Sequence, residues 1–376
     1  MKKLHHPGTP CKVVTQKDYH ISEIQGNNLE LVKCSDGWGL FGETEYWISD
    51  EEEKILDPKR GIRQFIPEEM ELRDWGFYSP INLEIELTKK CNQRCIHCWN
   101  ESGKNTFLSN KRLEKIIREF RSFGGQKIKL TGGEPLQYPD FFEFLDYSKS
   151  SGVKNIELTT NGAMIDGDNI SDLKNNVSRV NISLHGATKE THNKITQTPN
   201  YYKTIEAIRR CQLVGLDTVI NFTVMDENEI EVEYLFHLAE EMDSKIRLNL
   251  LMQVGYGKNL KDISNKLSKL RNQIYALSKK YSVNLERSGL YPSGYNKDIG
   301  SSKFYGCNTL RSGMYISAEG LVLPCNQSKK PIGNMYESSI EEIWRSKEAE
   351  NVRDITSCKL RNCGVLCSGK CNASNI

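Results

Sequence analysis

The stretch "INLEIELTKKCNQRCIHC", residues 81–98, joins a strand-like segment directly to three cysteines. Apolar and polar residues alternate over 81–87, which is the period of a β-strand with one buried face. Cys91, Cys95 and Cys98 follow at once. The sequence therefore predicts three thiols gathered in the loop at the carboxyl end of a strand.

This strand is the first of a repeating series. The later strand-like segments lie at 127–131, 155–160, 180–184, 218–224 and 246–251. The helical patterns between them lie near 109–123 (with Ser109 as the cap), 140–151, 167–176, 189–214 and 228–242. Strands that alternate with helices predict an α/β fold whose parallel sheet has right-handed crossovers and is either open or curled into part of a barrel.

Three further motifs stand where predicted strands end. They are "TGGEPL" (131–136), "TTNG" (159–162) and "SLHG" (183–186). Ligands of parallel sheets bind at the carboxyl ends of the strands, where the connecting loops converge. We therefore expect these motifs and the three thiols to face one mouth.

Composition narrows the setting. The formal net charge of the 376 residues is only +2, and the sequence shows no basic face, so we expect no nucleic-acid partner. No window is apolar enough for a membrane span, and "MKKLHHPGTPC" (1–11) lacks the apolar part of a secretion signal, which predicts a cytoplasmic protein. Twelve cysteines in that compartment favour metal or redox chemistry over disulfides.

Three clustered thiols suit one kind of metal site better than another. A structural zinc ion takes four ligands, and His97 would have to be the fourth, although it is adjacent to Cys98 in the chain. Thiolates also bind 4Fe–4S clusters. With three of them, one iron remains open for another ligand, so the missing fourth cysteine becomes the functional feature.

These motifs resemble those of the radical S-adenosylmethionine (radical SAM) superfamily. "CNQRCIHC" (91–98) matches its C-x3-C-x-aromatic-C signature with His97 in the aromatic slot, and "GGEP" (132–135) matches its second motif. The resemblance implies a partial (β/α)6 barrel and a 4Fe–4S cluster whose open iron binds S-adenosylmethionine. Reductive cleavage of that cofactor yields a 5'-deoxyadenosyl radical, which abstracts hydrogen from the substrate.

The resemblance also suggests residues that bind S-adenosylmethionine. Gly132 and Gly133 would let backbone approach the ligand, and Glu134 would face its ammonium group. The remaining cofactor-binding candidates are Ser183 at the ribose, Asn221, His97 and, with Asn221 in second rank, His185. Many relatives place an arginine after the fourth strand to hold the cofactor carboxylate, whereas this chain has Thr196 there. The sequence identifies no catalytic residue.

A second cysteine-rich region fills residues 307–376. Its first part predicts a hairpin that turns at Gly320 and brings Cys307 near Cys325, followed by a short amphipathic helix within 331–346. The later cysteines are Cys358, Cys363, Cys367 and Cys371. The region resembles the SPASM extension of radical SAM enzymes, in which seven cysteines hold two auxiliary 4Fe–4S clusters.

The match to that extension is incomplete, because the spacings between 358 and 367 differ and no seventh cysteine follows. By resemblance, one cluster would take Cys307, Cys325 and Cys371, and the other would take Cys358, Cys363 and Cys367. A single auxiliary cluster and a zinc ribbon are the alternatives.

Four domains are expected. A small α+β domain (1–78) has short strands in "LELVKCS", "GWGLFG" and "TEYWIS" and a helix in "DEEEKIL", and it either covers the barrel or binds the leader of a precursor peptide as an added strand. The barrel (79–255), a helical bridge (256–306) and the SPASM-like domain (307–376) follow.

Three classes of function are compatible with these motifs. The first is a radical SAM oxidoreductase that crosslinks or epimerises a ribosomally made peptide; the resemblance implies a flavodoxin or ferredoxin as electron donor. The second is a dehydrogenase or epimerase of a sugar or aminocyclitol, or a maturase of another enzyme. The third is a non-catalytic zinc-binding adaptor.

Two further observations bear on the choice. Cys211 follows a helical apolar pattern and is expected to pack in the core, which leaves the barrel without a spare thiol for epimerisation and favours oxidation. The chain ends in "CNASNI" (371–376) rather than in paired glycines, which argues against the molybdenum-cofactor cyclase branch.

Overall fold

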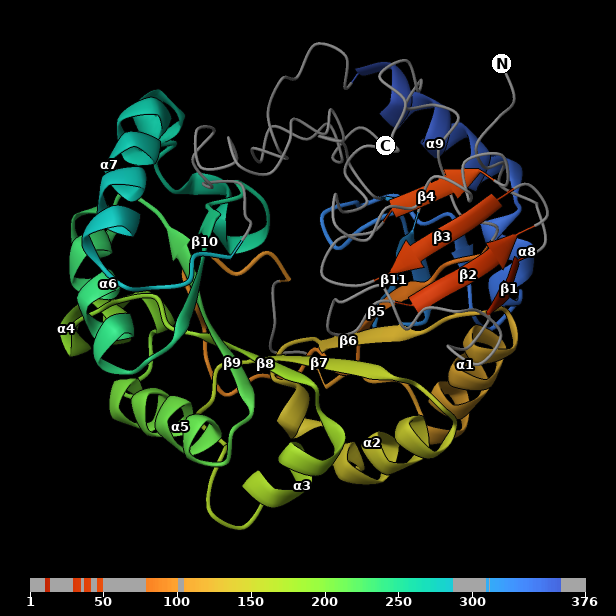
Figure 1. Cartoon of the computed structure of the whole chain (residues 1–376), viewed down its shortest axis with the longest axis horizontal. Helices are drawn as coiled ribbons and strands as arrows, with labels where there is room; N and C mark the ends of the chain where they lie inside the picture. The colour runs from red at the N-terminus through yellow and green to blue at the C-terminus, as the bar shows by residue number, and fades with distance from the viewer. Residues whose placement is uncertain are drawn as a thin grey trace.

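The computed structural model describes residues 79–100, 105–286, 309–310 and 312–353, together with the backbone of the strands within 11–49 and of 354–359 (Figure 1). Its main sheet has the strand order β10-β9-β8-β7-β6-β5-β11-β12-β13. The first six of these strands pair in parallel with their neighbours in sequence. Their bounds are β5 (Asn82–Glu86), β6 (Lys127–Thr131), β7 (Asn155–Thr160), β8 (Arg179–Ser183), β9 (Asp217–Val224) and β10 (Lys245–Leu250).

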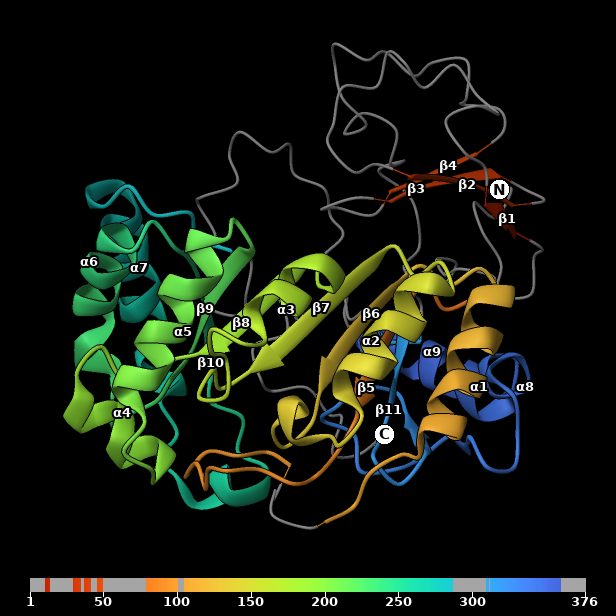
Figure 2. The ribbon, with the colours of Figure 1, turned by 90° about the horizontal axis from the view of Figure 1, so that it is seen from below.

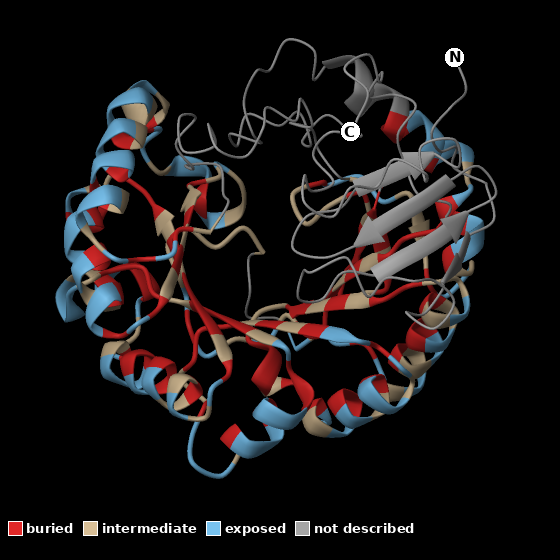
Figure 3. Ribbon diagram, in the orientation of Figure 1, coloured by how far each residue is buried: buried red, intermediate tan, exposed pale blue. Residues whose placement is uncertain are grey.

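Helices cover the outer face of this curved sheet, as Figures 1 and 2 show. They are α1 (Asn110–Ser122), α2 (Phe141–Ser150), α3 (Ile170–Asn176), α4 (Lys189–Thr196), α5 (Tyr201–Leu213), α6 (Val232–Glu241) and α7 (Leu267–Lys280). The apolar stripe of each helix packs on alternate strand residues; in α1 the stripe is Leu113, Ile116, Ile117 and Phe120, all fully buried. Figure 3 shows this buried layer between the sheet and the exposed outer helix faces. The predicted partial (β/α)6 barrel is confirmed.

One predicted helical stretch is two helices. The pattern over 189–214 is interrupted at Gln197, whose φ of 54° is left-handed, and at Pro199, which lacks an N–H donor. α4 therefore ends at Thr196, and α5 starts at Tyr201. By contrast, Ser109 caps α1 as predicted, accepting a hydrogen bond from the Arg112 amide at 3.4 Å.

The C-terminal region extends the same sheet. β11 (Gly313–Ile316) lies parallel to β5, and β12 (Leu321–Leu323) returns antiparallel to it, so the predicted hairpin is confirmed. Gly320 makes the turn with φ of 82°. The two-residue strand β13 (Gly333–Asn334) completes the sheet. α8 (Ile340–Trp344) is the predicted amphipathic helix, and α9 (Lys347–Lys359) follows it.

A separate antiparallel sheet lies near the N-terminus. Its order is β1 (Cys11–Val13), β2 (Glu30–Cys34), β3 (Gly37–Phe41) and β4 (Tyr46–Ser49). The three predicted short strands are therefore confirmed, and β1 is additional. The predicted helix at "DEEEKIL" lies outside the described residues, as do residues 287–306 of the predicted bridge.

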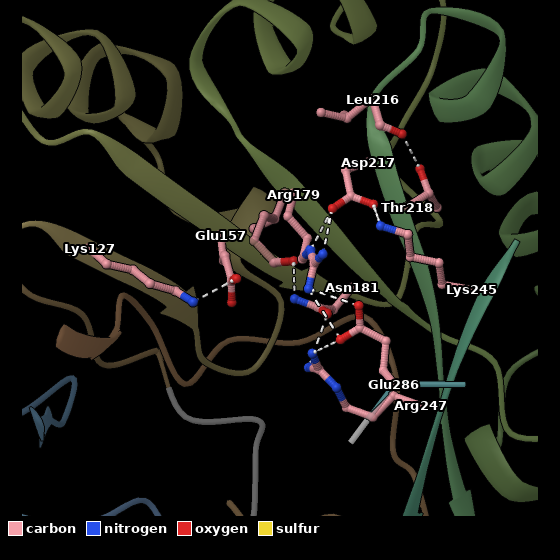
Figure 4. A network of polar contacts seen from close by, with 11 residues as sticks. Lys127, Glu157, Arg179, Asn181, Leu216, Asp217, Thr218, Lys245, Arg247 and Glu286 are labelled. Atoms are coloured by element: carbon pink, nitrogen blue, oxygen red, sulfur yellow. Dashed lines mark hydrogen bonds and ion pairs between the residues drawn. The ribbon is translucent and has the colours of Figure 1, made fainter. Parts of the chain in front are cut away.

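Ion pairs line the concave face of the sheet near the amino-terminal ends of β8, β9 and β10 (Figure 4). Arg179 pairs with Asp217 at 2.6 Å and with Glu286 at 3.0 Å, and Glu286 also binds Arg247 at 2.8 Å. The amide of Glu286 donates to the Ile246 carbonyl at 2.7 Å, so the segment after α7 lies along β10. These contacts lie near the amino-terminal ends of those strands, whereas the thiol loop (residues 91–98) follows the carboxyl end of β5. No helix in the described residues is long and apolar enough to cross a membrane.

Candidate functional site

The thiol loop, residues 91–98, follows β5 and places three reduced, partly buried cysteines together. Within it, the Cys98 amide donates to the Cys95 carbonyl at 3.1 Å, and the Gln93 amide points to the Cys91 sulfur at 3.4 Å. Burial, followed by the neighbouring Cys98 and Cys91, raises the pKa of the Cys95 thiol. The three predicted cluster ligands are therefore brought together in one loop.

Backbone contacts from three distant segments hold this loop. Gly133 and Glu134, after β6, donate to the carbonyls of Thr88 and Lys90 at 2.7 and 2.8 Å. Carbonyls at the end of α4, at 195 and 196, accept from the loop amides of residues 96 and 94 at 3.0 and 3.2 Å. The amide of Tyr256, after β10, donates to the Cys98 carbonyl at 2.8 Å. The loop is thus held by peptide groups of these three segments.

The glycine pair is required for a reason different from the predicted one. A Cβ on Gly132 would lie 2.4 Å from the Thr88 carbonyl oxygen, and a Cβ on Gly133 would lie 2.2 Å from that of Lys90. The close neighbour is therefore the chain that leads into the thiol loop. Whether these glycines also approach S-adenosylmethionine stays a prediction.

Glu134 is fully buried and braces two strand ends. Its Oε1 accepts from the Thr160 hydroxyl at 2.6 Å, and its Oε2 accepts from the Asn161 amide at 2.9 Å. Burial raises the pKa of this carboxyl, while these hydrogen bonds oppose the rise. The side chain joins the "GGEP" turn to the "TTNG" turn, so both motifs meet at the mouth as expected. Its predicted role at a ligand ammonium remains a prediction.

His97, a partly buried member of the thiol loop, lies with two buried histidines, His185 and His192. The ring centroids of His97 and His185 are 4.3 Å apart, and the His185 amide donates to His192 Nδ1 at 3.2 Å. Burial lowers the pKa of His97 and of His192 to about 4, and it lowers the pKa of His185 well below its usual value. All three imidazoles are therefore neutral near pH 7. The Nδ1 atom of His97 has no hydrogen-bond partner among the described residues.

The other residues predicted from the sequence lie toward the carboxyl ends of the barrel strands or at the end of α4. Ser183 and Asn221 are register neighbours on β8 and β9, both half-buried, and Asn249 Nδ2 donates to Asn221 Oδ1 at 2.6 Å. Thr196 is buried at the end of α4, and its hydroxyl lies 2.9 Å from the His192 carbonyl oxygen. The position at which relatives place a carboxylate-binding arginine is thus filled by a side chain that binds its own helix.

Outside the thiol loop, the structure describes the side chains of two cysteines, Cys211 and Cys325. Cys211 is fully buried in the core on α5, as predicted, and burial raises its pKa to about 12. Cys325 lies two residues beyond β12, partly buried. The remaining predicted ligands lie outside the residues whose side chains are described; they are Cys307, Cys358, Cys363, Cys367 and Cys371.

The thiol loop fits an iron–sulfur cluster by its donor chemistry. Thiolates bind the irons of 4Fe–4S clusters, and Cys91, Cys95 and Cys98 supply three such donors from one loop. In the described part of the chain, no three His, Cys, Asp or Glu side chains are arranged around one ion. Because each thiolate of a cubane binds a different iron, that arrangement is not required here.

One segment that packs against the thiol loop was not predicted from the sequence. It is the loop after β10, at residues 254–257. Gly255 has φ of 56°, and a Cβ there would lie 2.4 Å from the Cys98 carbonyl oxygen. The signal was present as "VGYG" (254–257), a second glycine-rich motif after a strand end.

Comparison with known families and proteins adds independent evidence. The family model of the radical SAM superfamily matches residues 85–239, and that of the SPASM iron–sulfur cluster-binding domain matches residues 307–372. The GTP 3',8-cyclase of Clostridium perfringens (strain 13) is 30% identical over 262 residues, which cover 65% of this chain and 79% of that protein. The AdoMet-dependent heme synthase of Methanosarcina barkeri is 27% identical over 322 residues, 77% and 91% of the respective chains.

Solved structures with this fold include two with TM-scores above 0.6. Streptococcus suis SuiB, bound to precursor peptide SuiA, has a TM-score of 0.63 at 20% identity and covers 74% of this chain and 67% of its own. The enzyme anSMEcpe, with bound AdoMet, has a TM-score of 0.62 at 18% identity and covers 74% and 84%. At these identities the likeness shows a shared fold.

Proposed function

Because the chain belongs to the radical SAM superfamily and carries a SPASM iron–sulfur cluster-binding domain, we propose that it oxidises a ribosomally synthesised peptide by hydrogen abstraction. Its cofactors are 4Fe–4S clusters and S-adenosylmethionine. Together, the reduced cluster and S-adenosylmethionine supply a carbon radical able to take hydrogen from an unactivated C–H bond. The chain itself holds and orients these groups.

The observation that carries the proposal is the position of the C-terminal region. β11 and β12 extend the barrel sheet directly beside β5, the strand that leads into the thiol loop. Cys325, a predicted auxiliary ligand, lies two residues beyond β12, and the thiol loop follows β5 of the same sheet. Oxidation of a substrate requires an acceptor for the electron left after hydrogen abstraction, and an auxiliary cluster next to the barrel meets that need.

Peptide as substrate has two supports. SuiB and anSMEcpe, which share the fold, have structures with a bound precursor peptide and with a bound Cp18Cys peptide, respectively. The N-terminal sheet has β1 and β4 as its outer strands, and an extended peptide can add to such an edge. In the proposed enzyme, Ser183, Asn221 and Glu134 contact S-adenosylmethionine, and a flavodoxin or ferredoxin delivers the electron.

Action on a small molecule, in place of a peptide, is the second candidate function. It is favoured by the sequence relatives, a GTP 3',8-cyclase and a heme synthase. A substrate panel separates the two: GTP, an iron tetrapyrrole, and short peptides encoded beside the gene are each incubated with the reconstituted protein, S-adenosylmethionine and dithionite. We expect one of the peptides to lose two hydrogen atoms by mass spectrometry. Consumption of GTP or tetrapyrrole alone would refute the peptide proposal.

Cofactor chemistry is tested without a substrate. Anaerobic reconstitution is expected to give about eight to twelve iron ions and about as many sulfide ions per chain, because two or three clusters hold about four of each. Replacing Cys91, Cys95 or Cys98 by alanine should abolish 5'-deoxyadenosine formation and remove about four irons while leaving the others. The control is Cys211→Ala, which should keep both. Zinc without sulfide would instead support the adaptor function.

A further inference from the structure

Glu86 lies where the barrel, the thiol loop and the C-terminal hairpin meet. It is in β5, and only 1% of its surface is exposed. Its Oε1 accepts a short hydrogen bond from Asn100 Nδ2, two residues beyond Cys98. Its Oε2 accepts from the Ala318 amide, in the turn between β11 and β12, at 2.9 Å. One buried carboxylate therefore joins the end of the thiol loop to the tip of the hairpin.

Neighbouring contacts join the same two elements. The rings of Trp99 and Tyr315 meet edge to face with centroids 5.9 Å apart, and Lys89 pairs with Glu319 in the hairpin turn. Trp99 lies just after the thiol loop, and Lys89 lies just before it. The hairpin is thus attached to both ends of the loop.

The Tyr315 hydroxyl makes the junction sensitive to displacement. It is buried without a hydrogen bond of good geometry among the described residues. Burial, followed by the carboxylates of Glu86 and Glu84, raises the pKa of this phenol. A shift of the hairpin would change the surroundings of two buried polar side chains, Glu86 and Tyr315, at once, and leaving such groups unsatisfied is costly.

We propose that Glu86 is a positioning residue that couples the thiol loop to the C-terminal hairpin, so that S-adenosylmethionine bound at the first cluster changes the environment of the auxiliary region. Each oxygen of the carboxylate serves a different element, so movement of one element weakens the contact to the other. Coupling of this kind is reciprocal between the two sites. The inference rests on the radical SAM and SPASM assignment and is independent of the substrate.

Glu84 provides the matched control. It lies on the same strand and face, two residues earlier, and it also contacts the C-terminal region, because Asn326 Nδ2 donates to its Oε1 at 3.1 Å. Its other bond is to Lys129 Nζ on β6 at 3.4 Å, and neither partner is in the thiol loop. Glu84→Gln therefore weakens the attachment of the C-terminal region without touching the link to the loop.

The test is hydrogen–deuterium exchange of the full, anaerobically reconstituted chain with and without S-adenosylmethionine. In the wild type, we expect the ligand to slow exchange in 95–100 and also, by about five-fold or more, in 313–323. In Glu86→Gln the slowing should persist in 95–100 and disappear in 313–323. Glu84→Gln should keep both responses. Asn100→Ala, which removes only the loop side of the junction, should behave as Glu86→Gln does.

A spectroscopic readout covers the case in which Glu86→Gln loses iron. The EPR signal of the auxiliary cluster should shift on addition of S-adenosylmethionine in the wild type and stay constant in Asn100→Ala. If the wild-type hairpin and auxiliary signal do not respond, or if Asn100→Ala responds as the wild type does, the coupling is refuted while S-adenosylmethionine cleavage still supports the assigned chemistry. Failure of the wild type to bind S-adenosylmethionine would overturn both.

Discussion

Gly133 has no space for a side chain, so a single methyl group there tests how the thiol loop is built. In Gly133→Ala the new Cβ would lie 2.2 and 2.7 Å from the carbonyl oxygens of Lys90 and Lys89, which cannot rotate away. We expect a loss of about 1–3 kcal/mol in the free energy of unfolding and failure to retain the first cluster. Thermal unfolding and iron analysis measure these effects.

The control for this change is Gly167→Ala. The nearest atom to its new Cβ is Arg210 Nη1 at 3.4 Å, on a flexible side chain. Full iron content in Gly133→Ala would show that the loop does not need the close approach.

Cys211 gives the opposite kind of prediction. Its thiol is fully buried in the core, and burial raises its pKa to about 12, so it stays protonated and away from the mouth. Cys211→Ala should leave turnover unchanged and cost only about 1 kcal/mol of stability, for the small cavity left by the sulfur. If Cys211→Ala instead gave a product in which the substrate radical had not received a hydrogen atom, the prediction would be contradicted and epimerisation favoured. Deuterium incorporation from solvent measures this return of hydrogen.

At this scale the sequence predicted which residues gather better than it predicted what each contacts. Cys91, Cys95 and Cys98 were found because their spacing alone carries a chemical meaning. The contacts of Glu134 and Glu86 depend on partners that lie 26 and 232 residues away, at Thr160 and Ala318. Such pairings follow from the folded topology and leave no local pattern.

Among the elements, α4 is the one that the site depends on most. Its first turn is fixed by Glu231, which accepts from the Ala187 amide at 2.7 Å and from the Thr188 hydroxyl at 2.7 Å. Its last carbonyls hold the thiol loop. Glu231→Gln replaces an acceptor oxygen by a donor and should lower the free energy of unfolding by about 1–3 kcal/mol.

We also expect Glu231→Gln to loosen the first cluster, measured as faster loss of iron to a chelator. The control is Glu190→Gln in the same helix, because the Glu190 side chain is 77% exposed. Equal iron loss in both variants would show that the anchoring of α4 does not reach the loop.

His192 on the same helix predicts sensitivity to acid. Burial lowers its pKa to about 4, so the folded chain binds this proton less readily than the unfolded chain does. The stabilisation is complete above about pH 6.5 and declines as the pH falls toward 4, with about 2 kcal/mol lost by pH 5. Chemical denaturation at pH 7 and pH 5 measures this difference.

His192→Asn keeps an acceptor for the His185 amide and should reduce the stability lost between pH 7 and pH 5 by about 2 kcal/mol, leaving the contributions of His97 and His185, whose pKa values burial also lowers. His237→Asn is the control, because that side chain is 60% exposed on α6. An unchanged pH slope in His192→Asn would contradict the assignment.

Strands and helices were predictable from the sequence where a regular spacing of apolar residues continues over the whole element. The six parallel strands and the helices between them follow from alternation and from apolar stripes. The break at 197–200 was not predicted, although Pro199 marks it in the sequence, because apolar residues on both sides keep a helical spacing. The pairing of β11 with β5 was also not predicted, since it joins strands 231 positions apart in register.

For the whole molecule, that pairing makes the C-terminal region part of the barrel. β5 has β6 on one side and β11 on the other, and α8 contacts α1 through the Ile340 amide and the Glu119 carboxylate at 3.1 Å. Deleting residues 307–376 would expose the edge of β5 and the apolar residues beneath α8. We expect an aggregating chain, or one with a markedly lower thermal midpoint. A soluble, cooperatively unfolding product with the wild-type midpoint would show that the barrel is independent.

The three segments that surround the thiol loop all come later in the chain, at 133–134, 195–196 and 256. The cysteines therefore emerge from the ribosome first, and roughly 160 more residues must be translated before Tyr256 exists, which takes about 10–30 s at about 5–20 residues per second. Until then, the segments that surround the thiol loop in the folded protein are not all present to cover the nascent thiols. Delivery of iron and sulfide by the assembly machinery accordingly belongs after translation of the barrel, and a stalled or truncated message would leave oxidisable cysteines exposed in the cell.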